Sequence, residues 1–223
     1  MIHSTQPSLF HLTLMCSNLC AAYGGVPLYE NVSFSLSEGA VVAVSAPNGA
    51  GKTTLLRHIA GLLAHGKGEI AWFEHPIKTM QDYQQDAIYL SDKNGLSLDL
   101  TVMQQLRFFA DGWGERTRID ASVHYLGLEP FLEMRISTLS AGWKRRVALS
   151  RLLIIPALLW ILDEPMVHLD KDGVNLLGGM IHAHAERGGV AIIAMPEMDQ
   201  TYQLYNIPVV KLDITDFAPS FVV

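Results

Sequence analysis

The fold of this 223-residue chain is decided by the stretch Ala46-Pro47-Asn48-Gly49-Ala50-Gly51-Lys52-Thr53-Thr54. It follows the apolar run 41–44 and opens a segment with helical periodicity, so it forms a glycine-rich turn between a buried strand and a helix. The backbone N–H groups of such a turn and the positive end of the helix dipole point at one spot, where a polyphosphate fits. Lys52 adds a mobile charge, and the Thr53 hydroxyl is placed to coordinate Mg2+. The stretch predicts a phosphate-binding loop whose binding residues are Asn48, Gly49, Ala50, Gly51, Lys52, Thr53 and Thr54.

The first position of this loop departs from the strict pattern, which begins with glycine. Ala46 fits the turn only if its φ is negative, because positive φ strains any residue with a Cβ atom. A chance glycine-rich turn is the alternative interpretation. The order of strand, loop, lysine, hydroxyl and helix favours the phosphate site.

Composition and charge limit the possible partners. The net charge is −6, whereas proteins that bind phosphate backbones usually have a basic face, so we expect no nucleic acid partner. The longest uncharged run near the middle, 152–162, contains Pro156 and is too short to span a bilayer, which needs roughly 20 apolar residues. The first lysine or arginine is Lys52, so we expect no secretory or transit signal and a protein that stays where it is made. If the protein works at a membrane, its partners must supply the spans.

The cysteines and histidines give no metal or redox motif. Cys16 and Cys20 match neither C-x-x-C nor C-x-x-C-H spacing, and we expect reduced thiols near a strand. His182 and His184 lie two apart in a helical segment, where side chains diverge by about 200°. We expect both to lie on a solvated helix face.

Periodicity predicts an α/β chain with two additions to its core. Alternating apolar residues at 9–14 and 32–36 predict an antiparallel β lobe, and helical spacing predicts a helix over 51–65 whose stripe, including Leu62 and Leu63, packs on the sheet. Further strands are predicted at 69–73, 87–90, 158–162, 190–194 and 208–212, and helices at 101–110, 120–126, 141–155 and 170–186. We expect one domain, 1–223, with a core of about 9–92 and 156–212 and an inserted helical lobe of about 96–155.

The helical lobe has more apolar and aromatic residues than a short helix pair can bury. We expect most of them in the core and a few in a docking groove for another chain. The candidates are Leu96, Leu98, Phe108, Phe109 and Trp113.

A tyrosine precedes the loop by roughly two dozen residues. Tyr23 adjoins the turn residues Gly24 and Gly25, and its ring is suited to stack on an adenine, which is worth roughly 1–3 kcal/mol. The alternative is an ordinary turn tyrosine. The loop downstream favours stacking.

A second anion site is predicted where the helix 141–155 begins. Ser140 is a natural N-cap, and the bare backbone at a helix N-terminus attracts negative charge. The basic run Lys144-Arg145-Arg146 follows. We expect it to solvate an exposed face rather than to contact phosphate directly.

Two carboxylates end the continuous apolar run 158–162, which is typical of a strand buried on both faces. Ligands bind outside the carboxyl ends of such strands, so Asp163 and Glu164 should face the same crevice as Lys52. Asp163 would hold Mg2+ through its water shell, and Glu164 would polarise the attacking water as the catalytic base. The alternative is an acidic pair that caps the next turn.

These motifs together resemble the ATP-binding cassette family over nearly the whole chain. The phosphate loop, an L-S-x-G stretch at 139–142 and the acidic strand end recur there in this order. The resemblance implies a P-loop NTPase fold with a RecA-like core, ATP and Mg2+ as cofactors, and a head-to-tail homodimer. In that family the signature residues corresponding to Ser140 and Gly142 close over the nucleotide held by the other copy.

Within the family, the stretches 139–142, 145–152, 158–165 and 169–174 are similar to the ATP-binding subunits that serve cytochrome c maturation. This resemblance implies an ATPase bound to integral membrane partners, on the cytoplasmic face of the inner membrane or the matrix face in an organelle. There it would drive haem export by releasing a haem-loaded chaperone. We expect no stably bound haem in this chain itself.

Four positions depart from the wider family and bear on hydrolysis more than on binding. Ala46 replaces glycine, Trp143 replaces the glutamine that ends the signature, and Pro196 stands where a switch histidine is usual. Asp92 stands where a glutamine senses the γ-phosphate and is a third candidate Mg2+ ligand beside Thr53 and Asp163. The alternatives are therefore the ATPase of another small exporter, or a nucleotide-gated structural subunit that hydrolyses slowly or not at all.

Overall fold

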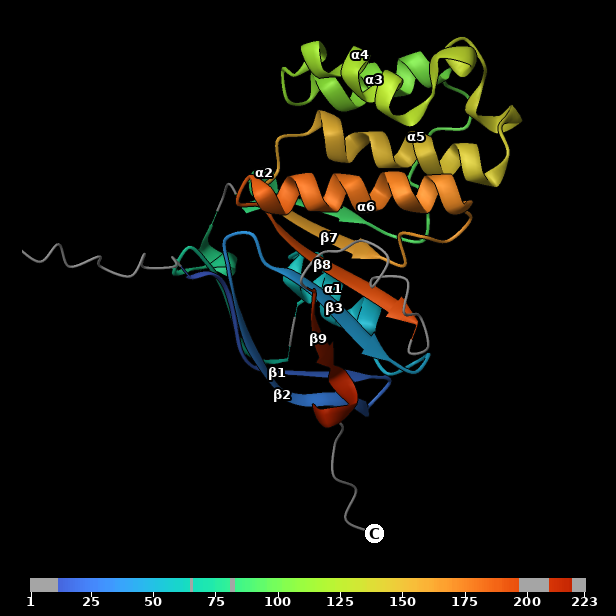
Figure 1. Ribbon diagram of the computed structural model, residues 1–223. Helices are drawn as coiled ribbons and strands as arrows, with labels where there is room; N and C mark the ends of the chain where they lie inside the picture. The colour runs from blue at the N-terminus through green and yellow to red at the C-terminus, as the bar shows by residue number, and fades with distance from the viewer. Residues whose placement is uncertain (1–11, 65, 81–82, 197–208, 218–223) are drawn as a thin grey trace, which may run out of the picture.

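The computed structural model describes residues 12–64, 66–80, 83–196 and 209–217, and it contains two sheets (Figure 1). The five-stranded sheet has the order β6-β7-β8-β3-β9, and every pairing in it is parallel. Its strands are β6 (Ala87–Leu90), β7 (Leu159–Asp163), β8 (Val190–Pro196), β3 (Val41–Ala46) and β9 (Val209–Asp213). The four-stranded antiparallel sheet consists of β2 (Val26–Ser37), β1 (Leu12–Tyr23), β4 (Lys67–Trp72) and β5 (His75–Pro76).

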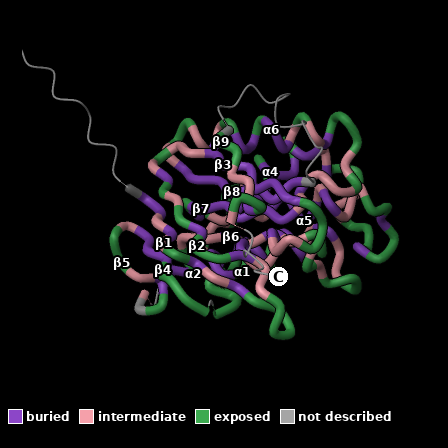
Figure 2. Tube along the Cα trace, turned by 90° about the horizontal axis from the view of Figure 1, so that it is seen from below, coloured by how far each residue is buried: buried purple, intermediate pink, exposed green. Residues whose placement is uncertain are grey.

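The parallel sheet forms the middle layer of the molecule. Every residue of β3 and β7 is buried, as expected for strands covered on both faces, and Figure 2 shows buried residues along these central strands. On one face, the helix α1 (Lys52–Ile59) packs between the parallel sheet and the antiparallel sheet, where Leu55 and Leu56 join a core with Leu14 and Val42. Because neighbouring strands are parallel, the segments that follow β3, β6, β7 and β8 meet at one edge.

Helices cover the other face of the parallel sheet. They are α3 (Val102–Asp111), α4 (Ile119–Leu126), α5 (Ala141–Ile154) and α6 (Lys171–Glu186), and a short helix α2 (Tyr83–Asp86) precedes β6. In Figure 1, α5 and α6 lie against the sheet and α3 and α4 lie farther out. Thr101 begins α3 with a capping box to Gln104, and Asp170 caps α6 through the N–H of Gly173.

The helix after the phosphate loop is shorter than its periodicity predicts. It ends at Ile59, because Gly61 has a φ of 68° that breaks the helical path. Leu62 is 58% exposed and Leu63 is 45% exposed, so the prediction that they pack on the sheet is wrong. Residues 9–11 and 208 of the predicted strands lie outside the described residues.

Two further observations concern sequence-based expectations. Cys16 and Cys20 both lie in β1, as expected, and neither forms a disulfide within the described residues. In the described part of the chain, no helix is long and apolar enough to cross a bilayer.

Candidate active site

The phosphate loop has the backbone that its sequence predicts. Ala46 is the last residue of β3, fully buried, and it is not among the residues with positive φ, as its side chain requires. Gly49 and Gly51 have φ values of 86° and 101°, which favour glycine. A Cβ atom on Gly51 would also lie 3.2 Å from Cδ1 of Tyr29, so a larger residue there would require the Tyr29 ring to shift slightly.

Lys52 lies folded against this loop at the start of α1. Its Nζ donates to the carbonyl oxygen of Ala46 at 2.7 Å and to that of Pro47 at 3.3 Å, and the side chain is buried. A phosphate oxygen carries negative charge and therefore attracts the ammonium more strongly than an uncharged carbonyl oxygen does. Phosphate oxygens in the loop would therefore compete well with these carbonyls for the ammonium.

A cavity of about 250 Å³ brings most of the predicted binding residues together. It is lined by Leu28 and by Tyr23, Asn48, Gly49, Gly51, Lys52, Thr53, Thr54 and Glu164. The candidate base therefore shares one space with the candidate phosphate ligands, and Tyr23, which is 81% exposed, lies at the rim. Ala50, Asp92 and Asp163 are not among its lining residues.

The backbone at Glu164 is unusual. Its φ is 47°, in the left-handed region that a non-glycine residue seldom adopts, and its N–H donates to the carbonyl oxygen of Ala194 on β8 at 3.1 Å. Strain of this kind persists only where surrounding contacts fix it. The turn after β7 thus holds a half-buried carboxylate in a defined place.

Asp163 is buried at the end of β7 and bound by a tyrosine. The hydroxyl of Tyr89 on β6 donates to Oδ2 of Asp163 at 3.0 Å, and Tyr89 is also hydrogen bonded to Arg57 on α1. Burial raises the pKa of Tyr89 to about 12, so the hydroxyl keeps its proton and remains a donor. The bond holds the Asp163 carboxylate at the carboxyl end of β7.

The oxygen donors fit Mg2+, which takes one or two carboxylates and completes its shell with water and substrate phosphates. Thr53 lines the cavity, and Asp163 ends β7, which β8 separates from β3 in the sheet; these two residues remain the candidate ligands of the ion. Asp92 is exposed in the loop after β6. Within the described residues, no cluster of three or more histidine, cysteine or carboxylate side chains could bind a metal by itself.

Ser140 and Gly142 lie in a different cavity, of about 140 Å³, together with Trp143, Arg146, His168, Leu169 and Asp170. Ser140 caps α5, as predicted, by accepting a hydrogen bond from the N–H of Trp143 at 3.4 Å. A Cβ atom on Gly142 would lie 3.0 Å from the carbonyl oxygen of His168, so the helix approaches that loop closely. The Trp143 ring packs on Phe131, with centroids 4.2 Å apart, rather than remaining free in solvent.

The sequence-based expectation for Arg145 is also wrong. It is fully buried rather than on a solvated face. Its guanidinium donates to the carbonyl oxygens of Ser91 at 2.7 Å, Pro165 at 2.9 Å and Glu164 at 3.1 Å, and to Oδ1 of Asn94 at 3.1 Å. Burial lowers its pKa to about 10, which leaves it charged at neutral pH. The signal was available, because Ala148, Leu149 and Leu152 follow Arg145 at the helical spacings that define a buried stripe.

Two other predicted positions can be compared with the structure. His184 is buried against Trp160 instead of solvated, because α6 turns this side chain toward β7; His182 is exposed, as expected. Pro196 is the last residue of β8 and pairs in register with Ala46, so its backbone lies beside the phosphate loop.

A parallel sheet with this loop after β3 and this carboxylate pair after β7, two strands away, is typical of a phosphate-loop ATPase. Residues 29–167 match the ABC transporter family. A putative ABC transporter ATP-binding protein from Pyrococcus furiosus has the same fold, with a TM-score of 0.77 over 93% of this chain and 100% of that chain at 24% identity.

The cytochrome c biogenesis ATP-binding export protein CcmA of Roseobacter denitrificans is 40% identical over 183 residues, which are 82% of this chain and 84% of the relative. That of Paracoccus denitrificans is 41% identical over 182 residues, 81% of each chain. The chain therefore belongs to the ABC transporter family, in the group of cytochrome c biogenesis ATP-binding export proteins. This membership confirms the predicted fold class and the prediction of an ATP-binding hydrolase.

Proposed function

We propose that this chain binds Mg-ATP in the 250 Å³ cavity and hydrolyses it to drive a membrane complex of cytochrome c biogenesis. The observation that supports this most is that Glu164 shares the cavity with Lys52 and Thr53. A base that polarises water must lie within reach of the γ-phosphate, and Lys52 and the loop N–H groups fix where that phosphate would lie.

Each candidate residue has a separate part in this proposal. Lys52 and the backbone of the loop hold the phosphates, and Tyr23 at the rim stacks on the adenine. Thr53 and Asp163, with Asp92 as a third candidate, hold the Mg2+, which neutralises phosphate charge when it is bound. Glu164 takes the proton of the attacking water. Asn48, Gly49, Ala50, Gly51 and Thr54 complete the phosphate site.

We also propose a head-to-tail homodimer. Ser140 and Gly142 lie in a cavity apart from Lys52, so one copy alone does not bring them to its own phosphates. A second copy would place its Ser140, at the N-terminus of α5, over the nucleotide of the first. Each copy is a single domain, 1–223, with the core and the helical lobe that the sequence predicts.

The partners in this proposal are integral membrane subunits that supply the spans. Phe108 and Leu98 of the helical lobe are 69% and 54% exposed and offer an apolar contact surface. The complex would export haem by releasing a haem-loaded chaperone, with this chain bound peripherally on the cytoplasmic or matrix face. Haem and nucleic acid would not bind this chain stably.

The test is affinity purification of the tagged chain from detergent-solubilised membranes, followed by identification of the co-purified membrane subunits. We expect a stoichiometric integral membrane partner, and loss of holo-cytochrome c when Lys52→Ala replaces the wild type. Normal cytochrome c in that strain would contradict the role in biogenesis. If the co-purified subunits belong to a different exporter, this result would favour the alternative that the chain is the ATPase of another small exporter.

A second candidate function is a nucleotide-gated structural subunit that closes on ATP but hydrolyses it slowly. Pro196 and Asp92 favour it, because neither supplies the side-chain donor that is usual at its position in the family. The steady-state ATPase rate of the purified complex separates the two candidates. Rapid turnover supports the hydrolase, and nucleotide-dependent dimerisation without turnover supports the structural subunit.

A further inference from the structure

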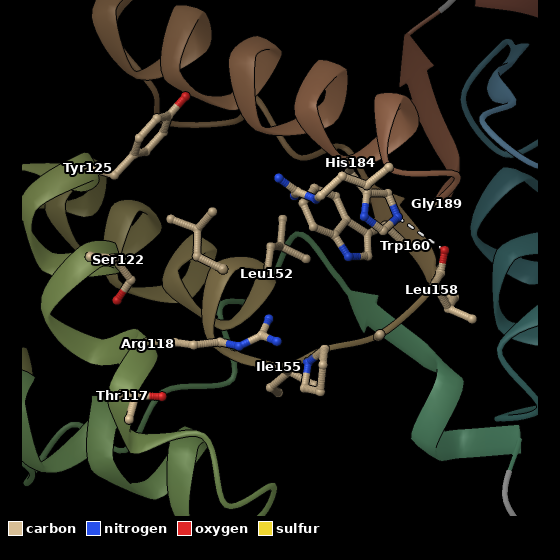
Figure 3. A pocket seen from close by; sticks show the side chains of 15 residues that line it. Thr117, Arg118, Ser122, Tyr125, Leu152, Ile155, Leu158, Trp160, His184 and Gly189 are labelled. Carbon is tan, nitrogen blue, oxygen red and sulfur yellow. Dashed lines mark hydrogen bonds between the residues drawn. The ribbon is translucent and has the colours of Figure 1, made fainter.

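A second large cavity, of about 630 Å³, lies at the amino ends of β7 and β8, whereas Lys52 follows the carboxyl end of β3 (Figure 3). It opens between α4, the end of α5, the end of α6 and the beginning of β7. Its volume is typical of sites for small organic molecules. None of the residues that line it also lines the 250 Å³ cavity, so the proposed nucleotide site does not account for it.

The floor of this cavity contains a buried donor without an acceptor. Trp160 is 2% exposed, and its Nε1 has no hydrogen-bond partner within the described residues. Figure 3 shows the Trp160 indole and the Arg118 side chain at the same cavity, and both residues line it. An unsatisfied buried donor costs roughly 1–3 kcal/mol, so a molecule whose acceptor reaches this nitrogen, after a shift of the side chains that cover it, gains part of this free energy on binding.

His184, which lies against Trp160, supplies neither an acceptor for Nε1 of Trp160 nor a charge. It stacks on Trp160 with ring centroids 3.8 Å apart, and its Nε2 is hydrogen bonded to the carbonyl oxygen of Leu158 at 3.1 Å. Burial lowers the pKa of His184 to about 4, so the ring is neutral at physiological pH. It positions the indole and adds no charge.

The charge of the lining is positive. Arg118 and Arg187 both line the cavity, and no aspartate or glutamate is among the described residues that do so. Glu115 binds Nε of Arg118 at 2.9 Å, and in the described part of the chain no group binds its two terminal nitrogens. These terminal N–H groups match the two oxygens of a carboxylate.

The remaining wall is mainly apolar. Leu152 and Leu153 of α5 continue into Ile155, Pro156 and Ala157, which adjoin the indole of Trp160. Such a wall excludes a small hydrated ion and accepts a hydrocarbon or aromatic body. We infer that this cavity binds an organic carboxylate with an apolar body, whose carboxylate accepts from Nε1 of Trp160 and pairs with Arg118.

Isothermal titration of the full chain tests the inference with four probes: decanoate, 2-naphthoate and the uncharged analogues decanol and 2-naphthol. We expect at least one carboxylate to bind with a Kd of about 1 mM or below, and at least about tenfold more tightly than its uncharged analogue. If no probe binds, the cavity holds only water and the inference is wrong. Equal affinity for the carboxylate and its uncharged analogue would mean that the cavity binds apolar molecules without a carboxylate site. This result would also overturn the inference.

Substitutions of cavity residues test whether the carboxylate binds in this cavity. Trp160→Phe keeps the ring stack but removes the N–H, and Arg118→Gln removes the cation; each should weaken binding about tenfold. Arg118 is 44% exposed, so its variant folds even if changes at Trp160 disturb the core. The control is Arg107→Gln, an exposed arginine on α3 that does not line the cavity and should leave affinity unchanged. Unchanged affinity in both cavity variants would contradict the inference.

Lys52→Ala separates this site from the nucleotide site. Carboxylate binding should survive this substitution, and ATP should not displace the probe, because the two cavities share no residue. If ATP displaces the probe from the wild type but not from Lys52→Ala, the probe had bound the nucleotide cavity. This result would overturn the inference and leave the proposed function standing.

Discussion

Nη2 of Arg145 on α5 donates a hydrogen bond of 3.1 Å to the carbonyl oxygen of Glu164. Nη1 of the same guanidinium reaches the carbonyl oxygen of Ser91, at 2.7 Å, in the loop that contains Asp92. One buried cation therefore connects the helix that begins at Ser140, the loop after β6 and the strained turn of the candidate base. We expect Arg145 to act through Glu164, as a positioning residue.

Arg145→Gln should lower kcat for ATP about tenfold to a hundredfold, because a displaced base loses its alignment with the water. The KM for ATP should change by less than about threefold, since Arg145 does not line the nucleotide cavity. Arg145→Lys, which keeps the charge, should recover part of the rate. The control is Lys144→Gln, whose ammonium contacts the carbonyl oxygen of Ser137 instead. A raised KM with unchanged kcat would contradict the positioning role.

Lys52→Ala should weaken ATP binding by about ten- to a hundredfold, because it removes a charge-assisted contact worth roughly 1.5–3 kcal/mol. Equilibrium binding of a fluorescent ATP analogue measures the change. Lys78→Ala, at an exposed lysine outside the cavity, is the matched control. Equal affinity in wild type and Lys52→Ala would rule out the loop as the phosphate site.

Stability should depend on pH through His184. Its pKa is about 4 in the fold, below the ordinary value of 6.5, so the unfolded chain binds the proton first as the pH falls. The free energy of unfolding gained from the neutral ring is complete above pH 6.5 and decreases toward pH 4, by about 3 kcal/mol in all.

Urea titrations between pH 7 and pH 4 should show this decrease in the wild type and in Trp160→Phe, which retains His184. The decrease should be smaller by about 3 kcal/mol in His184→Phe. An equally steep loss of stability in His184→Phe would assign the pH dependence to other groups.

Pro196→His should accelerate single-turnover hydrolysis in the assembled complex by at least about tenfold, without a matching gain in ATP affinity. Proline has neither a side-chain donor nor a backbone N–H, and the end of β8 lies in register with Ala46 beside the phosphate loop. Folding is checked by thermal melting. A well-folded variant no faster than wild type would mean that another group already supplies this donor.

The sequence predicts correctly those elements that depend on residues close together in the chain. The strand 87–90 and the cap of α6 at Asp170 match the structure residue for residue, because strand alternation and a capping side chain act within a few positions. The phosphate loop was predictable for the same reason.

The positions that failed depend on tertiary packing. Leu62 and Leu63 continue the apolar period of α1, yet Gly61 turns the chain away before they reach the sheet. Arg145 looked solvated because it stands between two other cations, whereas backbone carbonyls from two distant loops accept its hydrogen bonds. Sequence spacing contains no information on which carbonyls a fold will bring to a helix.

The central claim is that Glu164 polarises the attacking water in the Lys52 cavity. The most direct measurement compares ATP affinity and single-turnover hydrolysis for wild type and Glu164→Gln, which keeps the size of the side chain and removes its basicity. We predict unchanged affinity, hydrolysis slowed by at least about a hundredfold, and accumulation of an ATP-bound dimer. Hydrolysis at the wild-type rate in Glu164→Gln would contradict the account and transfer the search for the base to Asp92.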